Sequence, residues 1–148
     1  MRRGRRHGVD VGDVRIGVSV CDPDGILASP VETVAAGPKA IARLAELVGE
    51  HEVFECVVGL PVGLSGREGP AAAKVRAFCA DLQVAIDPVP IRLFDERMST
   101  MTADTLLRQS GRSTRTTRAI IDQAAATVIL QTALDSERTR GSAPGESL

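Results

Sequence analysis

Short stretches rich in valine and isoleucine open the chain. Residues 8–13 and 14–21 read as two strands joined by a Gly-Asp turn, and the sequence PDG at 23–25 turns the chain again toward ILASPVETV. The continuous apolar run FECVVGL is typical of a strand buried on both faces, and VPIRLFDER supplies a fifth strand. The pattern predicts three antiparallel strands followed by two strands with parallel neighbours.

Helical spacing of apolar residues follows the third strand. The segment GPKAIARLAELVGEH predicts one helix, and the segment after the loop PVGLSGREG predicts a second. From residue 99 onward the chain reads as helical, with a break at SGRSTRTTR and a final helix that ends near Ser136. The order β-β-β-α-β-α-β-α-α predicts a three-layer α/β domain around a mixed five-stranded sheet.

The length of 148 residues suits one domain. We expect residues 8–136 to form it, with a basic flexible head at 1–7 and a disordered tail at 137–148. No apolar run approaches the roughly 20 residues of a membrane helix, and three scattered cysteines among apolar neighbours are typical of buried, reduced thiols. These features predict a cytoplasmic protein without a membrane partner.

Charge is balanced over the whole chain, with a formal net charge of −1. Its cations are 16 arginines and only two lysines, Lys39 and Lys74. Arginine suits phosphate binding, although a biased genome composition would produce the same excess.

Acidic residues interrupt three apolar segments. Asp10 alternates with two valines near the carboxyl end of the first strand, Asp95 and Glu96 end the fifth strand, and Asp122 lies on an otherwise apolar helical face. Each acid could be structural by itself: a turn former at 10, a helix N-terminal acid at 96 and an ion-paired aspartate at 122. Taken together in one fold, Asp10, Glu96 and Asp122 favour a divalent metal site.

Carboxylates without histidine or cysteine select hard cations, so we expect Mg²⁺ or Mn²⁺. Such ions activate water and stabilise the leaving oxygen of a phosphodiester. Gly12 would let phosphate approach the turn beside Asp10, although hairpin geometry alone could require it, and Arg15 could reach that phosphate. Three arginines close to Asp122 are expected to contact a nucleic-acid backbone, namely Arg112, Arg115 and Arg118, with a solvated basic loop as the alternative. Arg97 could instead pair with an acid near the fifth strand.

Four segments together resemble the YqgF family, also called RuvX: GVDVGDVRIGVSV, VVGLPVGLSGREG, FDERMST and IIDQAAATVILQTALD. This resemblance covers Gly8 to Asp135 and implies an RNase H-like fold, related to Holliday-junction resolvases. It also implies a cytoplasmic nuclease that matures the 5′ end of pre-16S ribosomal RNA, with its acidic residues at Asp10, Glu96 and Asp122.

Two positions depart from the family pattern. Gly63 stands where asparagine is usual, and the fourth strand lacks the glutamate that related resolvases often carry at its end, so Glu96 must serve instead.

Other functions remain open on the sequence. A Holliday-junction resolvase would act as a homodimer, because it cuts two symmetric strands. A non-catalytic RNA-binding module is a further alternative. An actin-like ATPase would need two lobes around its nucleotide, and this chain supplies one.

Overall fold

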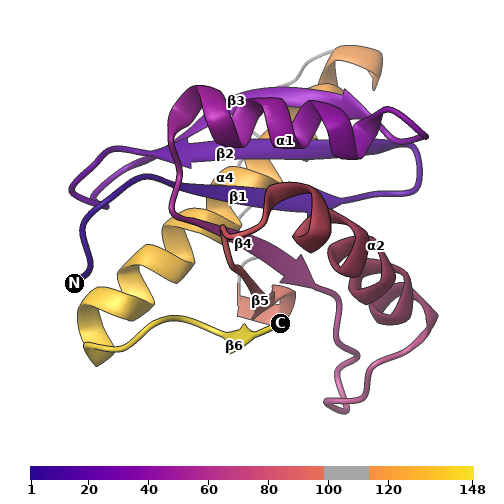
Figure 1. The fold of residues 1–148 in the computed structure, drawn as a ribbon. Helices are drawn as coiled ribbons and strands as arrows, with labels where there is room; N and C mark the ends of the chain where they lie inside the picture. The colour runs from indigo at the N-terminus through magenta and orange to yellow at the C-terminus, as the bar shows by residue number, and fades with distance from the viewer. Residues whose placement is uncertain (99–113) are drawn as a thin grey trace.

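A mixed sheet forms the centre of the molecule (Figure 1). The computed structural model describes residues 1–98 and 114–148, the second range as backbone alone up to residue 121. Within them the sheet has six strands in the order β3-β2-β1-β4-β5-β6. The strands are β1 (Arg6–Val11), β2 (Arg15–Cys21), β3 (Ala28–Ala35), β4 (Glu55–Leu60), β5 (Ile91–Asp95) and β6 (Glu146–Ser147).

Strand direction follows the expectation from the sequence. Strands β1, β2 and β3 are antiparallel neighbours, whereas β1, β4 and β5 run parallel. The carboxyl ends of β1, β4 and β5 therefore meet at one edge of the sheet, which is where parallel sheets place their ligands.

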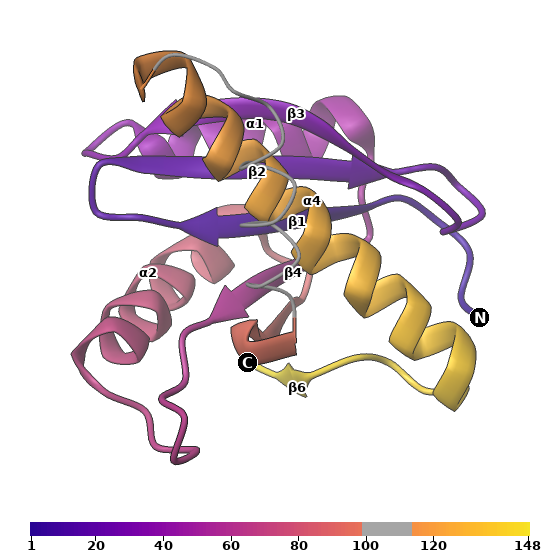
Figure 2. The ribbon, with the colours of Figure 1, turned by 180° about the vertical axis from the view of Figure 1, so that it is seen from behind.

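Helices cover both faces of the sheet, which confirms the three-layer α/β architecture. Helices α1 (Ala40–His51) and α2 (Pro70–Ile86) lie on one face. Helix α4 (Thr114–Arg140) crosses the other face over β1, β2 and β3, as Figure 2 shows. The short 3₁₀ helix η1 (Glu96–Met98) follows β5 directly.

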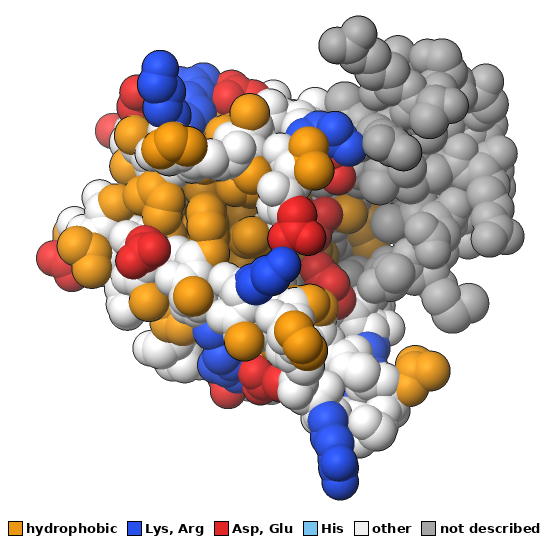
Figure 3. Space-filling model, turned by 90° about the vertical axis from the view of Figure 1, so that its right-hand side faces the viewer, with side chains coloured by type: hydrophobic (Ala, Val, Ile, Leu, Met, Phe, Trp, Pro, Cys, Tyr) orange, Lys and Arg blue, Asp and Glu red, His pale blue; other side chains and the backbone are white. Residues whose placement is uncertain are grey.

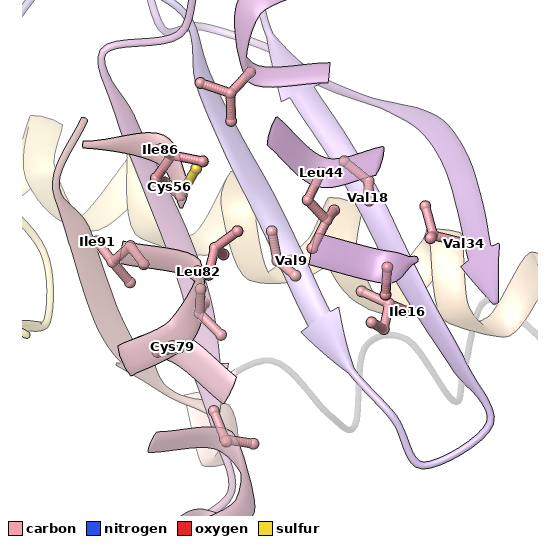
Figure 4. Close-up of a cluster of buried hydrophobic side chains, with 14 of the residues drawn as sticks. Val9, Ile16, Val18, Val34, Leu44, Cys56, Cys79, Leu82, Ile86 and Ile91 are labelled. Carbon is pink, nitrogen blue, oxygen red and sulfur yellow. The ribbon is translucent and has the colours of Figure 1, made fainter. Parts of the chain in front are cut away.

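The core is aliphatic, as a chain without tryptophan or tyrosine requires. On the α1 and α2 side, strand residues such as Val9 and Ile16 pack with Leu44 and Leu82 (Figure 4). The α4 side holds a second cluster that includes Val57, Phe94, Ile129, Leu130 and Leu134. Strand β4 is buried along its whole length because both layers pack on it.

The sixth strand corrects the expected count of five. Glu146 and Ser147 pair antiparallel with Leu93 and Arg92 of β5, and the Arg92 Nε donates a hydrogen bond to the Pro144 carbonyl. Two residues are too few to show strand periodicity in a sequence, so this strand depends on the free edge of β5.

Both chain ends differ from the flexible head and tail that the sequence suggested. Arg6, 1% exposed, is ion-paired with Glu137, 2% exposed, at 2.9 Å. Arg2 donates to Glu137 and, through two nitrogens, to Glu55. Helix α4 continues to Arg140 rather than ending near Ser136. Glu137 lies in this last part of the helix, where the buried network joins residues far apart in the chain.

The expected helix break at residues 110–118 overlaps the start of α4 at Thr114. The helix expected between residue 99 and that break lies outside the described residues. No helix in the described ranges is long and apolar enough to span a membrane. The cysteines are free and buried, as expected: Cys21, Cys56 and Cys79.

Candidate active site

Asp10 and Glu96 come from two strands that flank β4. Asp10 is the penultimate residue of β1, and Glu96 is the first residue after β5. Because both strands run parallel to β4, their carboxyl ends lie at the same edge. The side chains of Asp10 and Glu96 are joined by a hydrogen bond there.

Gly59 makes room for the Glu96 side chain. A Cβ added to Gly59 would lie 2.8 Å from Glu96 Oε1 and 2.9 Å from Glu96 Cγ. The Glu96 side chain thus occupies the space that a side chain at this position of β4 would need. This explains how a fourth strand without an acid at its end still has a carboxylate beside it.

Gly17 positions Asp122. Gly17 is the register partner of Asp10 on β2, and a Cβ added to it would overlap the Asp122 carbonyl oxygen. Only a glycine lets the α4 backbone approach the sheet this closely. The close approach brings Asp122 beside the strand position that carries Asp10.

The three carboxylates influence one another. Burial raises the pKa of Asp10, and the negative charge of Asp122 raises it further, while the hydrogen bond from Glu96 opposes the shift. Burial, with the charge and hydrogen bond of Asp10, raises the pKa of Glu96 from its ordinary value of 4.5 to about 7. Below a pH of about 7 Glu96 therefore keeps its proton and can donate it to Asp10.

Asp122 is held by Arg15. The Arg15 Nε donates to Asp122 Oδ2 at 2.9 Å, and both side chains are partly buried. Arg15 was expected to face phosphate, and it instead forms an ion pair inside the proposed ligand set. Within residues 1–98 and 122–148, no three His, Cys, Asp or Glu side chains stand in an arrangement that would hold a metal ion.

The donor chemistry nevertheless fits a hard divalent cation. Asp10 and Glu96, hydrogen-bonded to each other at the carboxyl edge of the sheet, supply the carboxylate oxygens that Mg²⁺ and Mn²⁺ use as ligands. Asp122 could join Asp10 and Glu96 on such an ion once it releases Arg15.

A pocket of about 280 Å³ opens beside Asp10 and Glu96. Its other walls include Gly12, Asp13 and the first turns of α2, with Lys74. Figure 3 looks onto this edge of the sheet, where acidic and basic side chains lie close together near the centre. Sequence reasoning missed Lys74, although its position five residues after the glycine-rich loop, in a chain with two lysines, was a usable signal.

Gly12 lines this pocket, but the turn itself requires a glycine there. A Cβ on Gly12 would lie 2.5 Å from the Arg15 carbonyl oxygen, which accepts a hydrogen bond from the Gly12 N–H. The alternative interpretation from hairpin geometry therefore accounts for this residue without phosphate.

Four further arginines were singled out from the sequence, and the structure describes the side chain of one of them. Arg97 pairs with Asp95 at 2.6 Å, which confirms the expected structural role and lowers the pKa of Asp95. Arg112 lies outside the described residues. The backbone of Arg115 and Arg118 belongs to the first turns of α4, and their side chains lie outside the described part.

Comparisons with known proteins identify the family of this chain. The family model RuvX, described as Holliday junction resolvase, matches residues 4–136. A Streptomyces avermitilis protein named "Putative pre-16S rRNA nuclease" is 61% identical over 150 residues, covering 100% of this chain and 96% of its own. A Nocardioides protein of the same name is 55% identical over 151 residues, covering 99% of this chain and 97% of its own.

The solved structures show the fold. A Thermus thermophilus RuvC in complex with a Holliday junction substrate has a TM-score of 0.62 and 19% identity, covering 98% of this chain and 99% of its own. A second structure of Thermus thermophilus RuvC has a TM-score of 0.60 and 18% identity, covering 97% and 99% of the two chains. The described residues thus share the fold of these two RuvC structures.

Proposed function

We propose that this chain, which belongs to the RuvX family, is a metal-dependent nuclease. Its proposed role is to process the 5′ end of precursor 16S rRNA. The observation that carries the proposal is the hydrogen-bonded Asp10 and Glu96 pair at the carboxyl edge of the sheet, with Asp122 close enough to affect it. Full-length relatives named as pre-16S rRNA nucleases support the choice of substrate. In this role the protein acts in the cytoplasm.

In this proposal Asp10, Glu96 and Asp122 hold Mg²⁺ or Mn²⁺. A bound ion of this kind supplies activated water and stabilises the charge on the leaving oxygen. Asp10 and Glu96 would both hold the ion in their ionised forms, and Glu96 would release its proton to solvent. Arg15 exchanges Asp122 for the substrate phosphate, and Arg112, Arg115 and Arg118 contact the nucleic-acid backbone next to it.

A second candidate is cleavage of branched DNA by a homodimer. The description of the matching family model as Holliday junction resolvase favours it. The two candidates share the carboxylates and differ in substrate and oligomeric state. A third possibility, RNA binding without catalysis, predicts binding that does not depend on the metal.

The deciding experiment compares wild type with Asp10→Asn and Asp122→Asn on two labelled substrates, a pre-16S 5′ leader RNA and a four-way DNA junction. Each reaction is run with Mg²⁺, Mn²⁺ or EDTA. We expect wild type to cut the RNA only with metal, and each variant to be slower by on the order of 100-fold or more, because a group that supports transition-state charge is lost.

Asp135→Asn is the matched control, since Asp135 is exposed and lies on the same helix as Asp122. It should cut like wild type. Cleavage of the junction alone would favour the resolvase. Equal RNA binding by all four proteins, without cleavage under any condition, would contradict a catalytic role and leave the binding module.

A further inference from the structure

Lys74 is the basic residue on the helical wall of the active-site pocket. Helix α2 presents Pro70, Ala71, Lys74 and Val75 to the pocket, which fits the periodicity of one helical face. Among the described residues that line the pocket, Lys74 alone carries a positive charge, and the same pocket contains Asp10 and Glu96. The Lys74 side chain therefore lines the same pocket as the two carboxylates.

The ion pair between Lys74 and Asp13 is weak. Its Nζ lies 3.5 Å from Asp13 Oδ1, and the two side chains are 69% and 80% exposed. Exposed ion pairs of this kind contribute little to stability. Lys74 can therefore exchange Asp13 for another anion at little cost to the fold.

Lys74 and Arg15 lie on different sides of the carboxylates. Lys74 approaches them from α2, on one face of the sheet, whereas Arg15 is bound to Asp122 of α4, on the other face. The pocket extends from Asp10 and Glu96 to α2, so a phosphate next to one at the carboxylates could occupy its α2 side. The pocket of about 280 Å³ has room for that phosphate and its sugar.

We propose that Lys74 binds the nucleic-acid phosphate adjacent to the one positioned at Asp10 and Glu96, so that the pocket between the end of β1 and α2 is a backbone-binding subsite. This inference rests on the proposed nuclease function and adds a substrate contact to it. The contact is to the sugar-phosphate backbone and therefore positions the strand without reading its sequence.

Chemical footprinting can test this contact at single-residue resolution, because the chain has two lysines. Wild type and Asp122→Asn are treated with an amine-acetylating reagent in Mg²⁺, with and without the pre-16S 5′ leader RNA, and the modified peptides are quantified by mass spectrometry. We expect the RNA to slow acetylation of Lys74 several-fold and to leave Lys39 nearly unchanged. Lys39 is exposed and does not line the pocket, so it serves as the internal control.

The salt dependence of RNA binding gives an independent measurement. Removing one phosphate contact to a single strand should reduce the slope of log K against log salt by about 0.7. Lys74→Ala should show this reduction, whereas Lys74→Arg and Lys39→Ala should keep the wild-type slope. Thermal denaturation should show all three variants folded, because both lysines are exposed.

Equal protection of the two lysines, or an unchanged slope in Lys74→Ala, would overturn the proposed subsite while RNA binding and cleavage remained. Absence of RNA binding by wild type would instead overturn the proposed function, and the subsite with it. The two failures are therefore distinguishable.

Discussion

At the scale of residues, the hydrogen-bonded carboxyl pair of Asp10 and Glu96 marks the candidate active site. The raised pKa of Glu96 means that the folded chain binds the Glu96 proton more tightly than the unfolded chain does. Between the ordinary pKa of 4.5 and the folded value of about 7, the folded state holds more protons, so the free energy of unfolding falls as pH rises. Above that range the site is destabilising unless a cation replaces the proton.

Glu96→Gln should therefore stabilise the metal-free protein at pH 8. The expected gain is roughly 1–2 kcal/mol after a discount for solvent screening, and it should vanish near pH 4, where Glu96 is protonated in both states. Urea denaturation in EDTA at several pH values measures the difference. Asp81→Asn, which removes an exposed carboxylate on α2, should show no such trend. A destabilised Glu96→Gln at pH 8 would contradict the raised pKa of Glu96.

At the scale of elements, the close packing of α4 on β2 decides where Asp122 stands. The contact between the helix backbone and Gly17 leaves no space for a side chain. Gly59 of β4 leaves space in a similar way, in this case for the Glu96 side chain. Glycines on two strands thus set the distances between carboxylates that come from three separate elements.

Gly17→Ala should destabilise the protein by about 1–3 kcal/mol, because α4 must move to admit the added methyl group. It should also reduce cleavage, since Asp122 moves with the helix. Gly49→Ala is the matched control: Gly49 lies in α1 with nothing within 4 Å of the added Cβ, so helix propensity should make this variant more stable by roughly 0.5–1 kcal/mol. Urea denaturation and the RNA cleavage assay measure both effects, and a Gly17→Ala protein as stable and active as wild type would refute this account.

At the scale of the whole molecule, a buried ion-pair network joins both ends of the chain to the sheet. Arg6 and Glu137 are almost completely buried, and Arg2 connects Glu137 with Glu55 of β4. The network fixes the carboxyl-terminal half of α4, and the segment after α4 then returns to pair with β5. Folding of the ends is therefore coupled to the same helix that carries Asp122.

Glu137→Ala should cost about 3–5 kcal/mol, because it leaves the buried Arg6 guanidinium without its carboxylate. Asp135→Ala, two residues earlier in an exposed pair with Arg138, should cost less than about 0.5 kcal/mol. Thermal or urea unfolding compares the two. Similar stability of both variants would show that the network contributes nothing.

Local patterns in the sequence predicted much of the architecture. The valine-rich strands and the two amphipathic helices each show their periodicity within a few residues, so the layers could be predicted. Asp10 and Glu96 stand at the ends of two of these strands, so their positions could be predicted as well. Arg97 could likewise be paired with a nearby acid, and Asp95 lies two residues away. Gly63, in contrast, departs from the family pattern, and its backbone N–H and carbonyl form hydrogen bonds with Arg67 and Gly66 in the loop.

The sequence by itself determined the α/β layers, the strand directions at the centre of the sheet and the residue types available for metal chemistry. Only the tertiary structure decided that Arg15 holds Asp122, that Lys74 lines the pocket, and that the tail adds a sixth strand. The physical reason is range: periodicity records what one segment buries, whereas an ion pair or a hydrogen-bonded carboxyl pair depends on atoms that folding brings together from distant positions. Glycines such as Gly17 belong to both levels, because the sequence shows them and only the packed helix shows why they are needed.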